Sequence, residues 1–259
     1  MNKENARWFW IVVVVLMMVG CGAPEPEVSE QPEAPAEQAA TPIDQSTVGS
    51  IGGKISFEGT KPKLARIMMD QDPVCVEKHS GPVYAEDGMV NDDGTLPNAF
   101  VYVKTGAEKY NFPTPTGSVE LDQDGCLYKP HVLGIMAGQT LQILTKDPTS
   151  HNIHPMPKDN REWNLSQPPG GAAIEQKFSR PEIMIPVKCN QHPWMRAYIG
   201  VTRHPFFAVT GKDGTFTLKG LPPGEYTIEA WTATFGTQEQ KVTVGPSEAK
   251  TADFSFKSS

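Results

Sequence analysis

The stretch that decides the fold is FAVTGKDGTFTLKGLPPGEYTIEAW, residues 207–231. Its apolar residues are β-branched or aromatic and occur in short runs, several of which alternate with polar residues, as is typical of β-strands. Asp213-Gly214 and Pro222-Pro223-Gly224 separate these runs and are turn sequences. The segment therefore predicts short strands joined by tight turns.

The same pattern extends outward over the chain. Apolar runs of strand length recur at residues 54–57, 99–103, 140–144, 182–187 and 206–209. No sustained 3.6-residue periodicity occurs beyond residue 20, and 24 prolines and 23 glycines disfavour a mostly helical protein. Many short strands at this spacing predict an all-β fold of the sandwich type.

The N-terminus predicts export. Lys3 and Arg7 precede an unbroken apolar run at residues 8–19, which is shorter than the roughly 18–20 residues that span a membrane. Met18-Val19-Gly20-Cys21 resembles a bacterial lipobox. We interpret residues 1–20 as a lipoprotein signal peptide and Cys21 as the lipidated residue. The expected location is extracytoplasmic, lipid-anchored to a bacterial membrane on its periplasmic side or at the cell surface.

Residues 21–47 are rich in proline and glutamate and contain no lysine or arginine. Such a segment buries little apolar surface and repels itself, so it predicts an extended, disordered tether. The folded part is expected to begin near Val48.

Charge and motifs exclude several functions. The formal net charge is −7 and no block of lysine and arginine occurs, which argues against a nucleic-acid partner. The chain contains no G-x-S-x-G, no H-E-x-x-H and no phosphate-binding glycine loop. We therefore expect a protein that is not an enzyme.

The chemistry is concentrated in a short segment that follows the apolar run at residues 182–187. Cys189, His192 and Met195 occur there at C-x2-H-x2-M spacing. On a tight loop that leaves a strand, this spacing can direct a thiolate, an imidazole and a thioether toward one point. Soft sulfur ligands with imidazole suit copper, which such a site holds as both Cu(I) and Cu(II).

A second histidine is offered by Ser150-His151-Asn152-Ile153-His154, and spacing alone does not choose between His151 and His154. With this segment, the chain resembles the cupredoxins, and most of all the amicyanin type. The resemblance implies a Greek-key β-sandwich and one type 1 copper ion held by His151, Cys189, His192 and Met195. It also implies that Asn152 ties the two ligand loops together by hydrogen bonds, and it leaves His154 as the alternative ligand.

The stretch at residues 207–231 resembles the carboxypeptidase regulatory-like domain, a transthyretin-like β-sandwich without catalysis. We therefore expect two β portions. The expected boundaries are 48–87 for an N-terminal β segment that can pair with the C-terminal part, 88–204 for the cupredoxin-like domain and 205–259 for the regulatory-like segment.

Two cysteines remain, Cys75 and Cys126. In an oxidising compartment two such cysteines usually form a disulfide. The alternative is a second metal site, in which Cys75 acts with His79 and Cys126 acts with His131.

The expected function is one-electron transfer between redox proteins, such as a cytochrome or a copper- or quinone-linked enzyme. The edge of His192 is the expected electron port, within an apolar patch of Pro155, Met156, Pro193 and Trp194. A single copper without a second histidine cluster argues against an oxidase or a nitrite reductase. Two alternatives remain: copper storage, delivery or sensing, and a surface-binding scaffold without redox activity.

Overall fold

The structure is a computed structural model that describes residues 39–258. The signal peptide, Cys21 and most of the expected tether lie outside the described residues and stay predictions. Within the described part, no helix has the length and apolar character needed to cross a membrane.

The last residues of the expected tether are ordered, which differs from the sequence expectation. The N–H of Thr41 donates to the carbonyl of Asn111 at 2.9 Å, and the N–H of Ser46 donates to the Asp44 carboxylate at 2.9 Å. These hydrogen bonds hold residues 39–47 against the folded part, so order begins before Val48.

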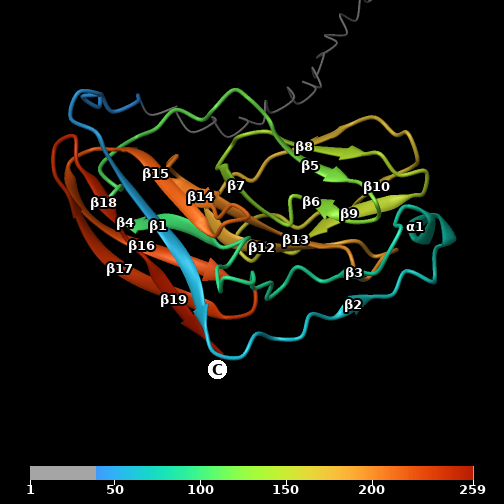
Figure 1. Cartoon of the computed structure of the whole chain (residues 1–259). Coiled ribbons are helices and arrows are strands. Elements are labelled where there is room, and N and C mark those ends of the chain that lie inside the picture. Colours follow the sequence, from blue (N-terminus) through green and yellow to red (C-terminus); the bar gives the residue numbers. More distant parts are fainter. Residues whose placement is uncertain (1–38, 259) are drawn as a thin grey trace, which may run out of the picture. The chain divides into compact units, whose positions relative to one another are not determined.

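The all-β fold predicted from the sequence is confirmed, and residues 39–258 form four main sheets and one short helix (Figure 1). Two of these sheets form what we call the C-terminal sandwich. One sheet contains β15 (Thr215–Leu221), β1 (Gly49–Glu58), β18 (Ala249–Thr251) and β19 (Phe254–Lys257). The other contains β14 (Phe207–Val209), β4 (Phe100–Thr105), β16 (Gly224–Thr232) and β17 (Gly236–Val244).

The remaining two sheets form what we call the ligand sandwich. One sheet has the order β10 (Leu165–Gln167), β9 (His151–Pro155), β12 (Glu182–Lys188), β13 (Arg196–Thr202), β7 (Val132–Met136). The other has the order β11 (Ile174–Gln176), β8 (Leu141–Thr145), β5 (Val119–Gln123), β6 (Tyr128–Lys129). A small ribbon of β2 (Arg66–Ile67) and β3 (Val83–Tyr84) flanks α1 (Pro73–Glu77).

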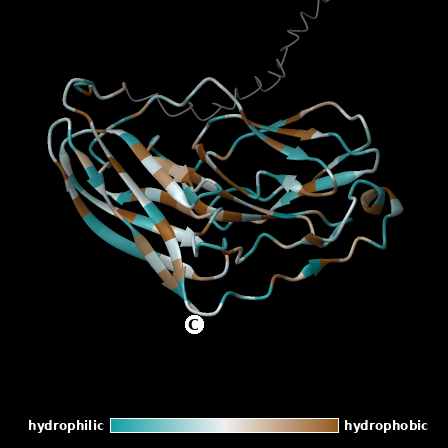
Figure 2. Cartoon of the chain, in the orientation of Figure 1, coloured by the Kyte–Doolittle hydropathy of each residue, from teal (hydrophilic) through white to brown (hydrophobic). Residues whose placement is uncertain are grey.

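Alternation along the strands explains the two cores. In β15 the side chains of Phe216, Leu218 and Leu221 are buried, while the polar residues between them are mostly exposed. The edge strand β17 consists mostly of hydrophilic residues, as its colour in Figure 2 shows. Each sandwich encloses its own cluster of buried apolar side chains. Because apolar residues alternate with polar ones along the strands, each sheet turns one apolar face inward, and each sandwich has its own apolar core.

Strand pairing crosses the domain boundaries expected from the sequence. The strand β4 falls in the range 88–204 that was expected to form the cupredoxin-like domain, but it pairs with β14 and β16 of the C-terminal sandwich. The strand β1 pairs with β15, β18 and β19. The C-terminal sandwich is thus assembled from three separate pieces of chain, at residues 49–58, 100–105 and 207–257. The ligand sandwich is formed by the chain between the second and the third piece.

Two glycines allow the sandwiches to pack closely. Gly134 on β7 and Gly200 on β13 are paired in register. A Cβ atom at Gly134 would lie 2.3 Å from the Phe207 ring, and one at Gly200 would lie 2.4 Å from the Phe100 ring. The absent side chains leave the space that the two aromatic rings occupy.

We expect Gly200→Ala to lower the free energy of unfolding by about 1–3 kcal/mol, because the added methyl group overpacks a fully buried contact with Phe100. Denaturant unfolding measures this change. Gly117→Ala is the matched control, since a Cβ atom there meets nothing within 4 Å. Equal stability of the two variants would contradict the packing argument.

Candidate metal centre

The strand pairing brings the two ligand segments together. Antiparallel pairing of β12 with β9 places Lys188 opposite His154. The chain then leaves β12 as a loop at residues 189–195, while His151 is the first residue of β9. The start of β9 and the loop after β12 therefore meet at one end of the ligand sandwich.

Three of the predicted ligands converge there. The Nδ1 atom of His151 lies 2.9 Å from the Nδ1 atom of His192, and the Sγ atom of Cys189 lies 3.7 Å from the latter. One ligand atom from each residue lies within 4.8 Å of the others. All three residues are buried, with exposed fractions of 0%, 2% and 4% for His151, Cys189 and His192. Two imidazole nitrogens and one sulfur thus face one small buried volume.

Met195 closes the same loop. Its side chain is fully buried and belongs to the same apolar cluster as Cys189. The N–H of Met195 donates to the carbonyl of His192 at 2.9 Å, and the N–H of Cys189 donates to the carbonyl of Met195 at 3.3 Å. These hydrogen bonds fold residues 189–195 into a tight turn that carries three of the four predicted ligands.

Each histidine is oriented by a carboxylate that sequence reasoning missed. The Nε2 atom of His151 lies 2.9 Å from Asp147, and the Nε2 atom of His192 lies 3.1 Å from Asp72. An Nε2–H that donates to a carboxylate leaves the Nδ1 lone pair directed at the cluster, as in many metal sites. Asp147 lies only four residues before His151, which was a usable signal. Asp72 lies 120 residues before His192, and nothing in the sequence links the two.

Asn152 lies between the two ligand segments. Its Oδ1 atom accepts a hydrogen bond from the N–H of Asn190 at 2.7 Å and one from the Sγ of Cys189 at 3.4 Å. Its Nδ2 group donates to Asn164 at 2.7 Å. The contacts of Asn152 are those that the cupredoxin resemblance implies for this residue.

His154 points elsewhere. Its Nδ1 atom lies 3.1 Å from Asn190 and its Nε2 atom lies 2.6 Å from Glu162. None of the clusters of metal-ligating groups among residues 39–258 includes it. The structure brings His151, rather than the alternative His154, to Cys189 and His192.

The expectation of an exposed His192 edge is wrong. His192 is only 4% exposed because Asp72, which caps the N-terminus of α1, contacts its outer nitrogen. Cys75 on α1 and Cys126 form a disulfide, and both sulfur atoms lie within 4.8 Å of a ring nitrogen of His192. A cover made by residues 60–87 therefore closes the site at this edge.

The second metal site considered from the sequence is not assembled. Cys75 and Cys126 are bonded to each other, the Nε2 of His79 lies 2.7 Å from the carbonyl of Gly125, and His131 contacts Asp87. The other two possible metal clusters in the described part of the chain both contain a disulfide cysteine and share a histidine with the first. The described residues thus hold one candidate centre.

Hydrogen bonds favour the charged forms of Cys189, Asp147 and His151 in this buried site. Burial raises the pKa of the Cys189 thiol, but hydrogen bonds from His151 and the backbone outweigh it and lower the pKa to about 7. Burial likewise raises the pKa of Asp147, but hydrogen bonds from His151 and from the N–H groups of Gly125 and Cys126 lower it to about 2. Burial disfavours a charged His151, yet Asp147 and Cys189 raise its pKa to about 9.

A buried carboxylate and an acidic thiol stabilise a cation in this cluster, which is the protonated His151 in the absence of a metal ion. A metal ion that binds there takes the place of this proton. Thiolate, imidazole and thioether groups are the ligands of type 1 copper. The residues present therefore fit a copper ion, which His151, Cys189 and His192 would hold, with Met195 in the same loop.

One part of the chain matches a known protein family. Residues 191–257 match the carboxypeptidase regulatory-like domain family. This match confirms the resemblance noted for residues 207–231, although it begins inside the ligand loop rather than at the expected residue 205. A comparison with curated proteins finds no match.

Several solved structures are similar over part of the chain. A copper-containing nitrite reductase from Thermus scotoductus SA-01 is 18% identical, with 39% of this chain and 25% of that chain covered and a TM-score of 0.31. A purple cupredoxin from Nitrosopumilus maritimus is 21% identical, with 32% and 98% covered and a TM-score of 0.28. A mutant of amicyanin in the Cu(I) form is 18% identical, with 39% and 98% covered and a TM-score of 0.30. The chain thus spans about a quarter of the nitrite reductase chain.

We expect Asp147→Asn to weaken copper binding about 10–100-fold, because removal of a ligand's carboxylate partner typically costs that much affinity. Competition with a chelator of known affinity measures the change. His154→Gln, on the same strand as the ligand His151, is the control and should bind copper as the wild type does. Loss of binding in the control alone would assign the ligand to His154 instead.

We expect the double variant Cys75→Ala and Cys126→Ala to lose ~4 kcal/mol in the free energy of unfolding, because the disulfide closes a loop of 51 residues. Guanidinium unfolding measures the loss, and the wild type in a dithiol reductant should approach the variant. An unchanged unfolding midpoint would mean that the cover is held without the disulfide.

Proposed function

We propose that this protein is a type 1 copper protein that transfers single electrons between redox partner proteins outside the cytoplasm. The observation that carries the proposal is the buried convergence of Cys189 with the Nδ1 atoms of His151 and His192. A bound copper ion supplies a one-electron couple. The residues that would hold it are buried, so the site excludes water.

The supporting residues act on ligand orientation and on charge. Asp147 and Asp72 orient the imidazoles through Nε2, and Asn152 fixes the Cys189 loop against β9. Burial excludes water, so the couple is set by the ligands and their hydrogen bonds. Met195, as the thioether in the loop, tunes the potential of such a site.

We further propose that a lipid anchor at Cys21 holds this protein at a bacterial membrane, on the periplasmic side or at the cell surface. The proposed partners are proteins such as a cytochrome or a copper- or quinone-linked enzyme. The proposal rests here on the N-terminal sequence. Short-lived docking with small interfaces suits such partners.

A second candidate is copper storage, delivery or sensing. It is favoured by the cover over His192, because a closed site also retains a metal ion. Cyclic voltammetry of the copper-loaded protein separates the two. A reversible one-electron couple supports electron transfer, and its absence in a copper-loaded protein supports storage or delivery.

We expect the purified protein with Cu(II) to show an intense thiolate-to-copper charge-transfer band in the visible spectrum. Cys189→Ser should abolish this band because the thiolate supplies its electron density. His154→Gln should retain it, since His154 contacts Asn190 and Glu162 instead. A colourless protein that is identical to the Cys189→Ser variant would overturn the type 1 copper proposal and favour a scaffold.

A further inference from the structure

The covered edge of His192 raises the question of where an electron enters. The His192 ring contacts Asp72 on one side, and the disulfide sulfurs lie close by. On another side its ring lies 5.1 Å, centroid to centroid, from the ring of Trp194. Trp194 is half-buried and belongs to the same ligand loop. It is therefore an aromatic group that contacts a ligand and also reaches the surface.

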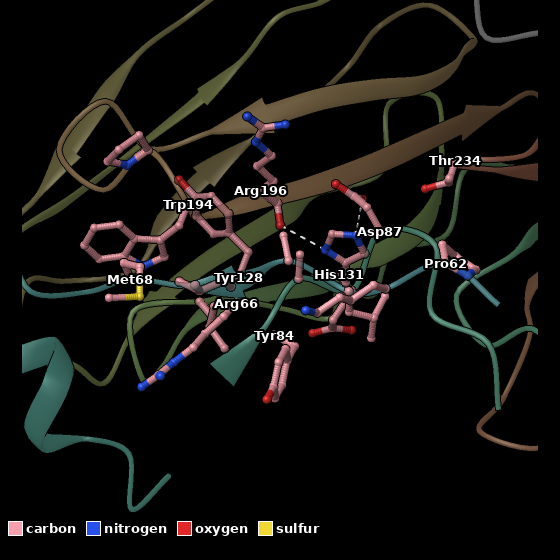
Figure 3. A pocket seen from close by; sticks show the side chains of 18 residues that line it. Pro62, Arg66, Met68, Tyr84, Asp87, Tyr128, His131, Trp194, Arg196 and Thr234 are labelled. Carbon is pink, nitrogen blue, oxygen red and sulfur yellow. Dashed lines mark hydrogen bonds and ion pairs between the residues drawn. The ribbon is translucent and has the colours of Figure 1, made fainter. Parts of the chain in front are cut away.

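Trp194 is held in that position. Its Nε1 group donates to the carbonyl of Cys126 at 3.0 Å, which ties the indole to the disulfide that anchors the cover. Trp194 and the exposed Pro193 line a groove of about 630 Å³ (Figure 3). The indole therefore forms a fixed path between the His192 ring and the groove.

The groove exposes apolar side chains that a folded protein usually buries. Three large hydrophobic residues of the described chain are exposed: Met68 at 57%, Val76 at 45% and Tyr84 at 47%. All three lie on the cover, and Met68 and Tyr84 line the groove beside Trp194. Figure 3 shows Met68 next to Trp194, with Tyr84 along the same wall. Exposed apolar side chains gathered at one place mark an interaction surface.

The rim of the groove is cationic in a protein whose net charge is −7. Lys63, Arg66 and Arg196 line it, are exposed, and form no ion pair within residues 39–258. The two carboxylates of the wall are engaged: Asp87 contacts His131 at 2.9 Å and Glu86 accepts from Asn98 at 2.8 Å. Both carboxylates keep their charge, so three cations against two carboxylates give the groove lining a small net positive charge.

A second hollow of about 610 Å³ borders the other side of the ligand loop. It shares Pro193 and Arg196 with the groove and adds Lys188, another cation. The ligand loop therefore borders both hollows, and the positive side chain of Arg196 lines each of them.

We propose that the groove at Trp194 is the docking surface for the acidic face of a redox protein, and that Trp194 replaces the His192 edge as the electron port. This inference rests on the proposed copper function. One electron leaves the site through the contact with Trp194 and reduces a one-electron acceptor centre in the partner. No atom or proton is transferred, and the indole itself is not oxidised. The cations steer the partner, and the exposed apolar side chains seat it.

The docking surface is tested first without any electron transfer. Hexacyanochromate(III) is a redox-inert, paramagnetic anion that broadens nearby NMR signals. Added to the ¹⁵N-labelled, metal-free protein, it should broaden the Trp194 indole signal and the backbone signals of Arg66 and Tyr84. The double variant Arg66→Glu and Arg196→Glu should lose this broadening. Lys219→Glu, a single charge reversal at an exposed position of β15, should retain it.

Broadening centred on Lys188 and Met156 would assign docking to the second hollow and overturn the proposal, as would an absence of broadening. A dimer that forms through the groove as concentration rises would replace the acidic partner with a second copy of this chain. Sedimentation velocity distinguishes this outcome.

The port is tested by oxidation of the Cu(I)-loaded protein with hexacyanoferrate(III), followed by stopped flow. The two arginine reversals should slow the reaction about tenfold or more at low salt, because electrostatic steering contributes at least that factor. Trp194→Leu should slow it several-fold with an unchanged visible band and potential, and Trp194→Phe should restore much of the rate. An intact band with unchanged rates overturns the port. A missing band in every variant, the wild type included, overturns the copper function instead.

Discussion

The loop that leaves β12 must stay clamped to the start of β9, and the side chain of Asn152 provides this clamp. Its carbonyl oxygen accepts from the N–H of Asn190 and from the sulfur of Cys189, while the backbone of the same residue continues β9. The Tyr128 hydroxyl reinforces the junction by donating to the carbonyls of Asn152 and Lys188, at 2.6 and 3.1 Å. The pairing of β9 with β12 brings the two ligand segments together, and these hydrogen bonds fix the loop after β12 against β9.

Burial of that volume creates an electrostatic demand that remote parts of the chain meet. A thiolate and two imidazoles in an apolar interior need hydrogen-bond partners, since unpaired polar groups are costly there. Asp147 meets part of this demand from the loop before β9. Asp72 meets the rest from the cover, where it also caps α1 through the N–H of Val74 and accepts from Thr149. The cover therefore completes the site as well as closing it.

The C-terminal sandwich packs closely against one sheet of the ligand sandwich. Aromatic rings of β4 and β14 pack onto the glycine positions of β7 and β13, and β13 begins directly after the ligand loop. The matched regulatory-like segment begins inside that loop, at residue 191. The match therefore includes β13 of the ligand sandwich as well as the strands β14 to β19 of the C-terminal sandwich.

The sequence alone determined the all-β architecture, because alternation of apolar residues and turn sequences are local properties that need no partner. It also pointed to Cys189, His192 and Met195, since their ligand chemistry is apparent within seven residues. Residue spacing left His151 and His154 open, and the cupredoxin resemblance favoured His151. Only the tertiary structure decided that β4 belongs to the C-terminal sandwich and that His192 is covered. These features depend on pairs such as Asp72 and His192, which are 120 residues apart. Contacts at that separation are selected by the packing of whole sheets, and no local pattern of residues encodes them.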